Sequence, residues 1–249
     1  MCTFVILRRS SNPWPVIIAA NRDERLTRKF ESPARHWKDF PDVVGGWDET
    51  RGGTWFAIND AGVMAAIMNR PNSLGPHDDK RSRGELILEA LTHADASAAA
   101  ESLAYIKPTS YAPFNMVIVD NTFACWLKHD GSGKIEVSEI PEGYSMITSN
   151  DRNDYNVPRV RTYLPRFQSA KAPDPDQDQW RDWESLLGQR LYSAKDGPQG
   201  AMCIVDEENN YGTVCSQLLA IPHVESRRKP IFRFANGRPG EAPFSPVEL

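Results

Sequence analysis

Short β-type runs that come in closely spaced pairs constrain the fold of this chain more than any other feature. Residues 3–7 and 16–20 are rich in apolar and β-branched side chains and flank a Ser-Asn-Pro turn. Residues 54–59 and 63–69 form a second pair, joined by an Asn-Asp-Ala-Gly turn. Because parallel strands need long crossover connections, pairs of this kind predict hairpins and antiparallel sheets.

Further runs extend this pattern along the chain. Strands are predicted at residues 115–119, 123–127, 135–137, 144–148, 201–205, 212–221 and 231–234. Helices are predicted after the capping box Ser82-x-x-Glu85, from Asp95 or Ser97 to Tyr105, and within 157–192, with a loop at 171–175. Residues 25–42 and 72–79 are interpreted as loops, and the chain from about 236 as an irregular tail. Strands and helices that come in groups predict an α+β protein, which we interpret as a single domain over residues 1–249.

Composition excludes several classes of function. A net charge of −4 provides no global field that would attract nucleic acid or an anionic membrane. No apolar run approaches the roughly 20 residues that cross a bilayer, and the N-terminus lacks the pattern of a secretory signal. The cysteines form no C-x-x-C motif and the histidines show no ligand spacing, so no metal site is expected. We therefore expect reduced thiols and a cytoplasmic protein.

Cys2 is the first candidate for chemistry. Initiator methionine is normally removed when the next residue is small, and Cys2 would then carry a thiol and a free α-amine. An α-amine has a reference pKa of about 7.7–8.0, so much of it is unprotonated near neutral pH. One residue could thus supply both nucleophile and general base. The alternative is a chance small residue at the start of an edge strand.

Four polar residues, Asn21-Arg22-Asp23-Glu24, follow the second predicted strand. If the first two strands form a hairpin, Arg22 or Asp23 lies next to Cys2. A carboxylate there would hold the amine, and a guanidinium there would favour the thiolate. The alternative is a solvated turn with an ordinary ion pair.

Two asparagines are candidates for binding an oxyanion. Asn69 ends the strand predicted at 63–69, and Asn150 comes just after the strand predicted at 144–148, where a sheet edge could direct both side-chain amides at one point. The alternative for each is an ordinary turn asparagine.

An ordered set of motifs extends nearly from end to end of the chain. The motifs are Met1-Cys2-Thr3, Ala20-Asn21-Arg22-Asp23-Glu24, Pro33-Ala34 with Trp37, Gly52-Gly53-Thr54-Trp55, Ala66-Ile67-Met68-Asn69-Arg70, Ser82-Arg83-Gly84, Phe114-Asn115, Ser149-Asn150 and Tyr211-Gly212-Thr213. Together they resemble the NRDE family, also called the transport and Golgi organisation protein 2 family. The resemblance implies a fold similar to that of N-terminal nucleophile hydrolases, a four-layered αββα sandwich of two antiparallel sheets flanked by helices. Within that group the family is similar to the branch of choloylglycine hydrolases and penicillin V acylases, which cleave linear amides with an N-terminal cysteine.

The resemblance implies roles for individual residues. Cys2 corresponds to the nucleophile, and Asp23 to the acidic residue that positions the new amine. Asn69 corresponds to the oxyanion asparagine, and Asn150 to a second asparagine near the N-terminus.

Other positions bear on the substrate or depart from the pattern. Arg22, Trp55 and Arg70 lie in the matching motifs and are assigned to substrate binding. The acylase branch carries an arginine where this chain has Ala20, and relatives often carry one where it has Val214.

The leading hypothesis is therefore a hydrolase that cleaves a small linear amide through an acyl-thioester on Cys2, without a cofactor. A second hypothesis is a non-enzymatic carrier or organiser on the same fold, which the resemblance connects with a hydrophobic, haem-type ligand. A third is a class II glutamine amidotransferase-like domain, which shares the leading Met-Cys.

Overall fold

The computed structural model describes residues 2–73 and 79–249, which divide into two compact units. Unit 1 combines Met1–Arg28 with Glu142–Glu248, and unit 2 comprises Lys29–Pro141. Each unit contains one sheet whose strands pair antiparallel, so the predicted α+β class is confirmed. Met1, whose removal we expect, and residues 74–78 of the loop predicted at 72–79 lie outside the described residues.

The sheet of unit 1 is built around the hairpin predicted at the start of the chain. In that hairpin Thr3 pairs with Asn21, and Arg8 pairs with Val16. The described strands run in the order β10-β1-β2-β12-β13-β14, and β11 pairs with β12. Their bounds are β1 Thr3–Arg8, β2 Val16–Arg25, β10 Gly143–Ile147, β11 Val205–Asp206, β12 Tyr211–Ile221, β13 Ile231–Ala235 and β14 Phe244–Val247.

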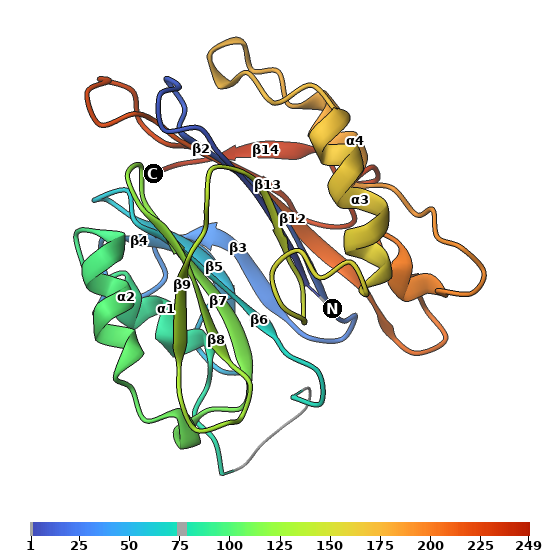
Figure 1. Ribbon diagram of the computed structural model, residues 1–249, viewed down its shortest axis with the longest axis horizontal. Helices are drawn as coiled ribbons and strands as arrows, with labels where there is room; N and C mark the ends of the chain where they lie inside the picture. The colour runs from blue at the N-terminus through green and yellow to red at the C-terminus, as the bar shows by residue number, and fades with distance from the viewer. Residues whose placement is uncertain (1, 74–78) are drawn as a thin grey trace. The chain divides into compact units, whose positions relative to one another are not determined.

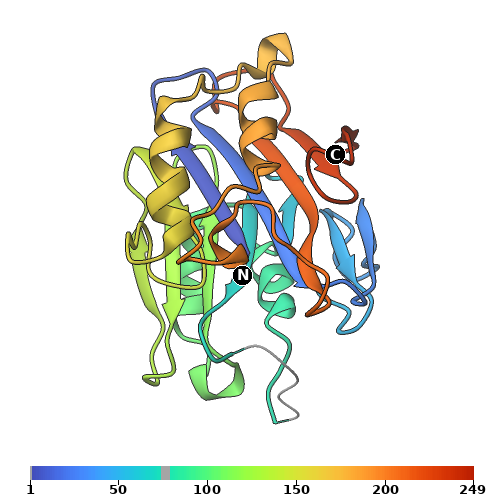
Figure 2. The same cartoon turned by 90° about the vertical axis from the view of Figure 1, so that its right-hand side faces the viewer.

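Two α-helices, α3 (Pro158–Ser169) and α4 (Arg181–Leu187), cover one face of this sheet (Figures 1 and 2). Because side chains alternate along a strand, every second residue of β1, β2 and β12 faces the helices. Val5, Ile17 and Leu218 accordingly share one buried cluster with helix residues such as Tyr163 and Trp183. The short 3₁₀ helices of unit 1 are η2 Pro175–Gln177 and η3 Pro198–Gly200.

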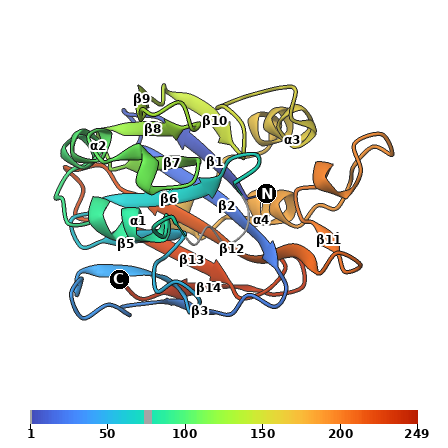
Figure 3. The same ribbon diagram turned by 90° about the horizontal axis from the view of Figure 1, so that it is seen from below.

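Unit 2 contains a meander in which each strand pairs with the next along the chain. Figure 3 shows α1 and α2 against this sheet, in which β5 to β9 follow one another. The strands are β3 Phe30–Ala34, β4 Val43–Asp48, β5 Phe56–Asn59, β6 Met64–Asn69, β7 Phe114–Val119, β8 Ala124–His129 and β9 Glu136–Glu139. The helices are α1 Gly84–Ala90, α2 Ala96–Ala104 and η1 Pro108–Ser110.

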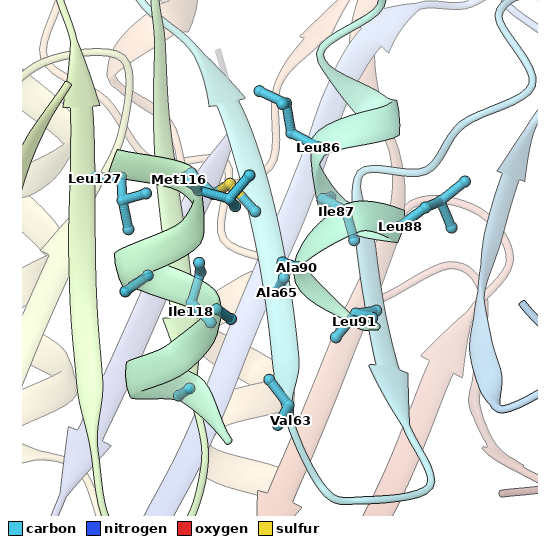
Figure 4. Close-up of a cluster of buried hydrophobic side chains, with 14 of the residues drawn as sticks. Val63, Ala65, Leu86, Ile87, Leu88, Ala90, Leu91, Met116, Ile118 and Leu127 are labelled. Atoms are coloured by element: carbon cyan, nitrogen blue, oxygen red, sulfur yellow. The ribbon is translucent and has the colours of Figure 1, made fainter. Parts of the chain in front are cut away.

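The core of unit 2 lies between its helices and one face of its sheet. Ile87 of α1 points toward the strands that carry Ala65, Met116 and Ile118 (Figure 4). Each of these side chains is buried, as expected where an amphipathic helix packs on a sheet. None of the helices in residues 2–73 and 79–249 has the combined length and apolar character needed to cross a bilayer.

The four polar residues predicted to follow the second strand are instead part of it. β2 continues to Arg25, because residues 21–25 pair with the first half of β12. Asn21, Arg22 and Asp23 are at most 4% exposed, which rules out the alternative of a solvated turn.

The sequence patterns predicted neither β4 nor two of the edge strands. β3 lies in the region predicted as a loop, and β14 lies in the tail predicted to be irregular. Both strands are at sheet edges and contain a proline, Pro33 and Pro246, which is typical of edges and obscures the strand pattern.

Two further local predictions were wrong. The strand predicted at 201–205 is reduced to β11, because the buried N–H groups of Cys203 and Ile204 donate to Gln189 O and Thr213 Oγ1. The capping box also fails, because Arg83 occupies the N-cap position of α1 and no side chain caps that end.

Candidate active site

Cys2 lies immediately before β1, at the open end of the first hairpin. Since Thr3 pairs with Asn21, continuing the antiparallel register by one residue places Cys2 opposite Arg22. Cys2 Sγ lies 3.6 Å from the carbonyl oxygen of Asp23, and Cys2 as a whole residue is partly exposed. The structure thus brings Cys2 and Asp23 together.

The carboxylate of Asp23 is held by two donors from distant parts of unit 1. Arg159 Nη1 donates to Oδ2 at 2.7 Å, and Thr213 Oγ1 donates to Oδ1 at 2.6 Å. The side chains of Asp23 and Arg159 have no exposed surface, and Thr213 is buried as well. Charge-assisted hydrogen bonds of this kind compensate the cost of burying the carboxylate and fix its orientation.

Arg159 also contacts the residue next to the thiol. Its Nη1 atom donates to Thr3 Oγ1 at 2.5 Å, so one nitrogen joins β1, β2 and α3. Arg159 follows Pro158, the first residue of α3, where proline suits the helix start. Figure 1 shows this end of α3 near the start of β1.

A β-bulge aligns the donor from β12. Thr213 pairs with Asp23 and Cys215 pairs with Arg22, which leaves Val214 as the extra residue. Directly paired residues present their side chains on the same face of a sheet, so the Thr213 hydroxyl meets the Asp23 carboxylate. The position that relatives often fill with arginine is therefore the bulge itself.

The electrostatics of the site favour the protonated thiol. Burial raises the pKa of the Cys2 thiol, and the negative charges of Asp23 and Glu24 act in the same direction. Burial, together with the charge of Asp23, also raises the pKa of Tyr211, whose hydroxyl donates to Asp23 O at 3.2 Å. A thiol in this environment needs a base to become a nucleophile.

Arg22 lies on β2, which is flanked by β1, the strand that Cys2 precedes, and by β12, which contains Cys215. It is 4% exposed and pairs with Cys215 across β2 and β12. Burial raises the pKa of Cys215 to about 12, and the charge of Arg22 opposes that rise. Its assignment to substrate binding stays a prediction.

Asn150 belongs to the loop that follows β10 in unit 1. Its Oδ1 accepts a hydrogen bond from Ser149 Oγ, and its Nδ2 donates to Asp154 Oδ2, each at 3.2 Å. The role of Asn150 as a second amide of the site stays a prediction from the resemblance.

Asn69, Arg70 and Trp55 belong to unit 2. Asn69 ends β6 opposite Phe114, and Arg70 Nη1 donates to Asn115 Oδ1 at 2.8 Å. Trp55 meets the ring of Phe30 edge-on, with 5.5 Å between centroids. Roles for these residues in oxyanion and substrate binding likewise stay predictions.

Sequence reasoning missed the two donors that hold Asp23. Thr213 was part of a matching motif without an assigned role, whereas Arg159 was not singled out at all. A usable signal existed, because Arg159 shares a helical stripe with the buried Tyr163 and Phe167. A charged residue on the apolar face of an amphipathic helix predicts a buried ion pair.

Three solved structures share the fold of this chain. The N-acylethanolamine-hydrolyzing acid amidase ortholog of Caenorhabditis elegans is 12% identical with a TM-score of 0.61, covering 92% of this chain and 98% of that chain. A variant of conjugated bile acid hydrolase from Clostridium perfringens is 12% identical with a TM-score of 0.57, covering 99% and 92%. Penicillin V acylase from Agrobacterium tumefaciens is 12% identical with a TM-score of 0.51, covering 95% and 83%. At this identity the likeness shows the fold alone, that of the N-terminal nucleophile hydrolases.

Sequence comparison identifies the family. The human transport and Golgi organization protein 2 homolog is 35% identical over 121 residues, which are 45% of this chain and 41% of the human protein. The mouse homolog is 34% identical over 121 residues, with the same shares. The chain thus matches less than half the length of these curated relatives. Residues 1–228 match the family described as Transport and Golgi organisation 2, and the chain belongs to that family.

Proposed function

We propose that this protein is an amidohydrolase whose nucleophile is the thiol of Cys2. One observation carries the proposal: the thiol of Cys2 adjoins the backbone carbonyl of Asp23, whose carboxylate is buried and held by Arg159 and Thr213. The names of the three solved structures add support, because an acid amidase, a conjugated bile acid hydrolase and a penicillin V acylase all cleave amides. A small linear amide is the substrate class that follows.

The proposed reaction begins once Met1 has been removed. The free α-amine of Cys2 takes the thiol proton, and the thiolate sulfur attacks the carbonyl carbon of the amide. The C–N bond then breaks, the leaving amine receives the proton, and an acyl-thioester remains on the sulfur. Water, deprotonated by the same α-amine, attacks the thioester, which releases the carboxylic acid and restores the thiol.

The raised pKa of the Cys2 thiol makes this base necessary. Asp23 supports the α-amine, because a fixed negative charge stabilises the ammonium that forms when the thiol proton is transferred. We assign the oxyanion to Asn69, with Asn150 as a second amide, on the resemblance alone. Removing a donor to an oxyanion costs about 3–4 kcal/mol in transition-state stabilisation.

The test is hydrolysis of a small panel of amides by protein whose N-terminus has been confirmed by intact mass. The panel contains an N-acylethanolamine, a glycine-conjugated bile acid and penicillin V, and products are followed by mass spectrometry. Cys2→Ala and Cys2→Ser variants are run in parallel. We expect turnover of at least one amide by the processed protein and none by Cys2→Ala. Equal turnover by Cys2→Ala would refute the proposal.

A further inference from the structure

The strongest feature outside the proposed chemistry is the placement of one buried guanidinium. Arg159 reaches Asp23 from α3, 136 residues further along the chain, and has no exposed surface. The same nitrogen that donates to Asp23 Oδ2 also donates to Thr3 Oγ1, directly beside Cys2. The guanidinium therefore sits at the point where the nucleophile's strand and the carboxylate's strand meet.

We propose that Arg159 is a positioning residue that orients the Asp23 carboxylate and balances its charge, and thereby tunes the basicity of the Cys2 α-amine. This inference rests on the proposed function, since the α-amine matters only if it acts as a base. Arg159 acts through Asp23 and does not itself contact the substrate.

The argument starts from the cost of burying a charge. A carboxylate without exposed surface takes up a proton unless a cation and hydrogen bonds compensate its desolvation. Guanidinium stays protonated at every pH at which proteins fold, so Arg159 supplies that compensation permanently. Thr213 adds a neutral hydrogen bond, which orients the carboxylate but provides no charge.

The consequence for the α-amine follows from charge balance. With Arg159 present, Asp23 and Arg159 together are neutral, and the ammonium loses its proton with little penalty. Without Arg159, deprotonating the ammonium would leave Asp23 as a buried lone anion. The α-amine beside that anion would therefore retain its proton to higher pH. Removing Arg159 must therefore raise the pH at which the base becomes available.

The charge of Asp23 is already felt at Cys2, because it raises the pKa of the adjacent thiol. We infer the same influence on the nitrogen of Cys2, because Cys2 directly precedes Thr3, which shares the Arg159 nitrogen with Asp23. Arg159 holds both sides of this arrangement, since it fixes Asp23 by its carboxylate and β1 by the Thr3 hydroxyl.

The test follows the α-amine directly in the processed full-length protein. The protein is labelled with [15N]cysteine, and the 15N chemical shift of the Cys2 α-amine is recorded against pH. The variants are Arg159→Met, which removes the charge, Arg159→Lys, which restores it, and Asp23→Asn. We expect Arg159→Met to raise the pKa of the α-amine by about one unit or more. We expect Arg159→Lys to return the titration to within a few tenths of a unit of the wild type.

A double variant keeps the test decisive if Arg159→Met does not fold. The Asp23→Asn/Arg159→Met protein contains no uncompensated charge, so its fold should persist. The double variant lacks both charges of a neutral pair, so its α-amine should titrate near the wild type, whereas Asp23→Asn alone leaves the guanidinium unbalanced and should titrate lower. A double variant that titrates with Asp23→Asn alone, or an unshifted α-amine in folded Arg159→Met, would overturn the inference.

Hydrolysis is measured separately on the same proteins, so that the two proposals fail differently. Shifted titrations without turnover of any amide by the wild type would leave the positioning role intact and remove the hydrolase. If Arg159→Met turns over the amide and the acid side of its pH–rate profile stays where the wild type has it, the hydrolase stands and the positioning role is removed. If Arg159 had only a structural role, its replacement would lower the amount of active protein without shifting the acid side of the pH–rate profile.

Discussion

Arg159 Nη1 lies 2.7 Å from Asp23 Oδ2, and neither side chain has any surface exposed to solvent. The pair links the helix layer of unit 1 to the end of its sheet that carries Cys2. Fully buried pairs of this kind are asymmetric in energy. Removing one partner leaves an uncompensated charge, whereas removing both can be nearly neutral.

The first prediction concerns the free energy of unfolding. Arg159→Met and Asp23→Leu should each destabilise the protein by about 3–5 kcal/mol, because each leaves the other charge buried and alone. The double variant should recover most of that loss. Urea unfolding followed by circular dichroism measures all three. Single variants that cost less than about 1 kcal/mol would show that the pair is not buried as described.

The second prediction concerns the thiols. Cys2→Ala should abolish amide turnover without changing the thermal unfolding midpoint, because Cys2 is only partly buried. Cys125→Ala serves as the matched control and should retain turnover, since the Cys125 side chain belongs to a buried core cluster and has no role in the proposed reaction. Cys125 is fully buried whereas Cys2 is partly exposed, so iodoacetamide at pH 8 should alkylate Cys2 in the processed protein and spare Cys125. Peptide mapping checks this, and alkylation of Cys125 in folded protein would count against the account.

The third prediction concerns Thr213, which satisfies two groups at once. Its hydroxyl donates to Asp23 Oδ1 and accepts from the backbone N–H of Ile204. Thr213→Val should lower the free energy of unfolding by about 1–3 kcal/mol, because it leaves a buried N–H and a carboxylate oxygen without that hydroxyl. Thr213→Ser should restore most of the stability. A valine variant as stable as the wild type would contradict the hydrogen bonds described.

The fourth prediction is a dependence of stability on pH in unit 2. Burial tends to raise the pKa of Asp120, but the backbone N–H groups of Ala96, Thr122 and Phe123 outweigh it and hold that pKa below its usual value. A carboxyl group with a lowered pKa stabilises the fold above its unfolded value of about 3.9 and loses that contribution as pH falls through its folded value.

Replacing Asp120 tests this dependence. Asp120→Asn should therefore be less stable than wild type by about 1–2 kcal/mol at pH 7. The difference should shrink as the pH falls below about 4. Urea unfolding of both proteins at a series of pH values is the measurement. A gap that stays constant down to the acid limit of folding would be the contrary result.

The carrier hypothesis makes a separate prediction. If the fold binds a haem-type ligand, titration with haem should shift the Soret band, and the shift should survive Cys2→Ala unless the thiol is a ligand. We expect no saturable shift from the hydrolase. A saturable shift together with no amide turnover would favour the carrier.

Much of the architecture could be predicted from local patterns. The hairpin of β1 and β2 was predicted because apolar runs flank a short turn, and its register places the polar residues of β2 near Cys2. The full length of β2 could not be predicted, because residues 21–25 have the composition of a turn. They remain in the strand because β12, nearly 200 residues away in sequence, pairs with them.

The partner of Asp23 illustrates the same limit at the site. A nucleophile at the start of a strand and an acid at the end of the next are close whenever the two strands pair, so local spacing was enough to predict them. Arg159 reaches the site only through the packing of α3 on the sheet, which no spacing near residue 159 specifies. Its buried helical stripe indicated a partner but not which one.

The most direct measurement is the mass of the protein quenched in acid during turnover of an amide substrate. The account predicts a chain that lacks Met1 and carries the acyl group of the substrate on the peptide that begins with Cys2. Hydroxylamine should release that group, because it is a thioester. A chain that turns over the amide while it retains Met1, or an acyl group on any other residue, would contradict the central claim.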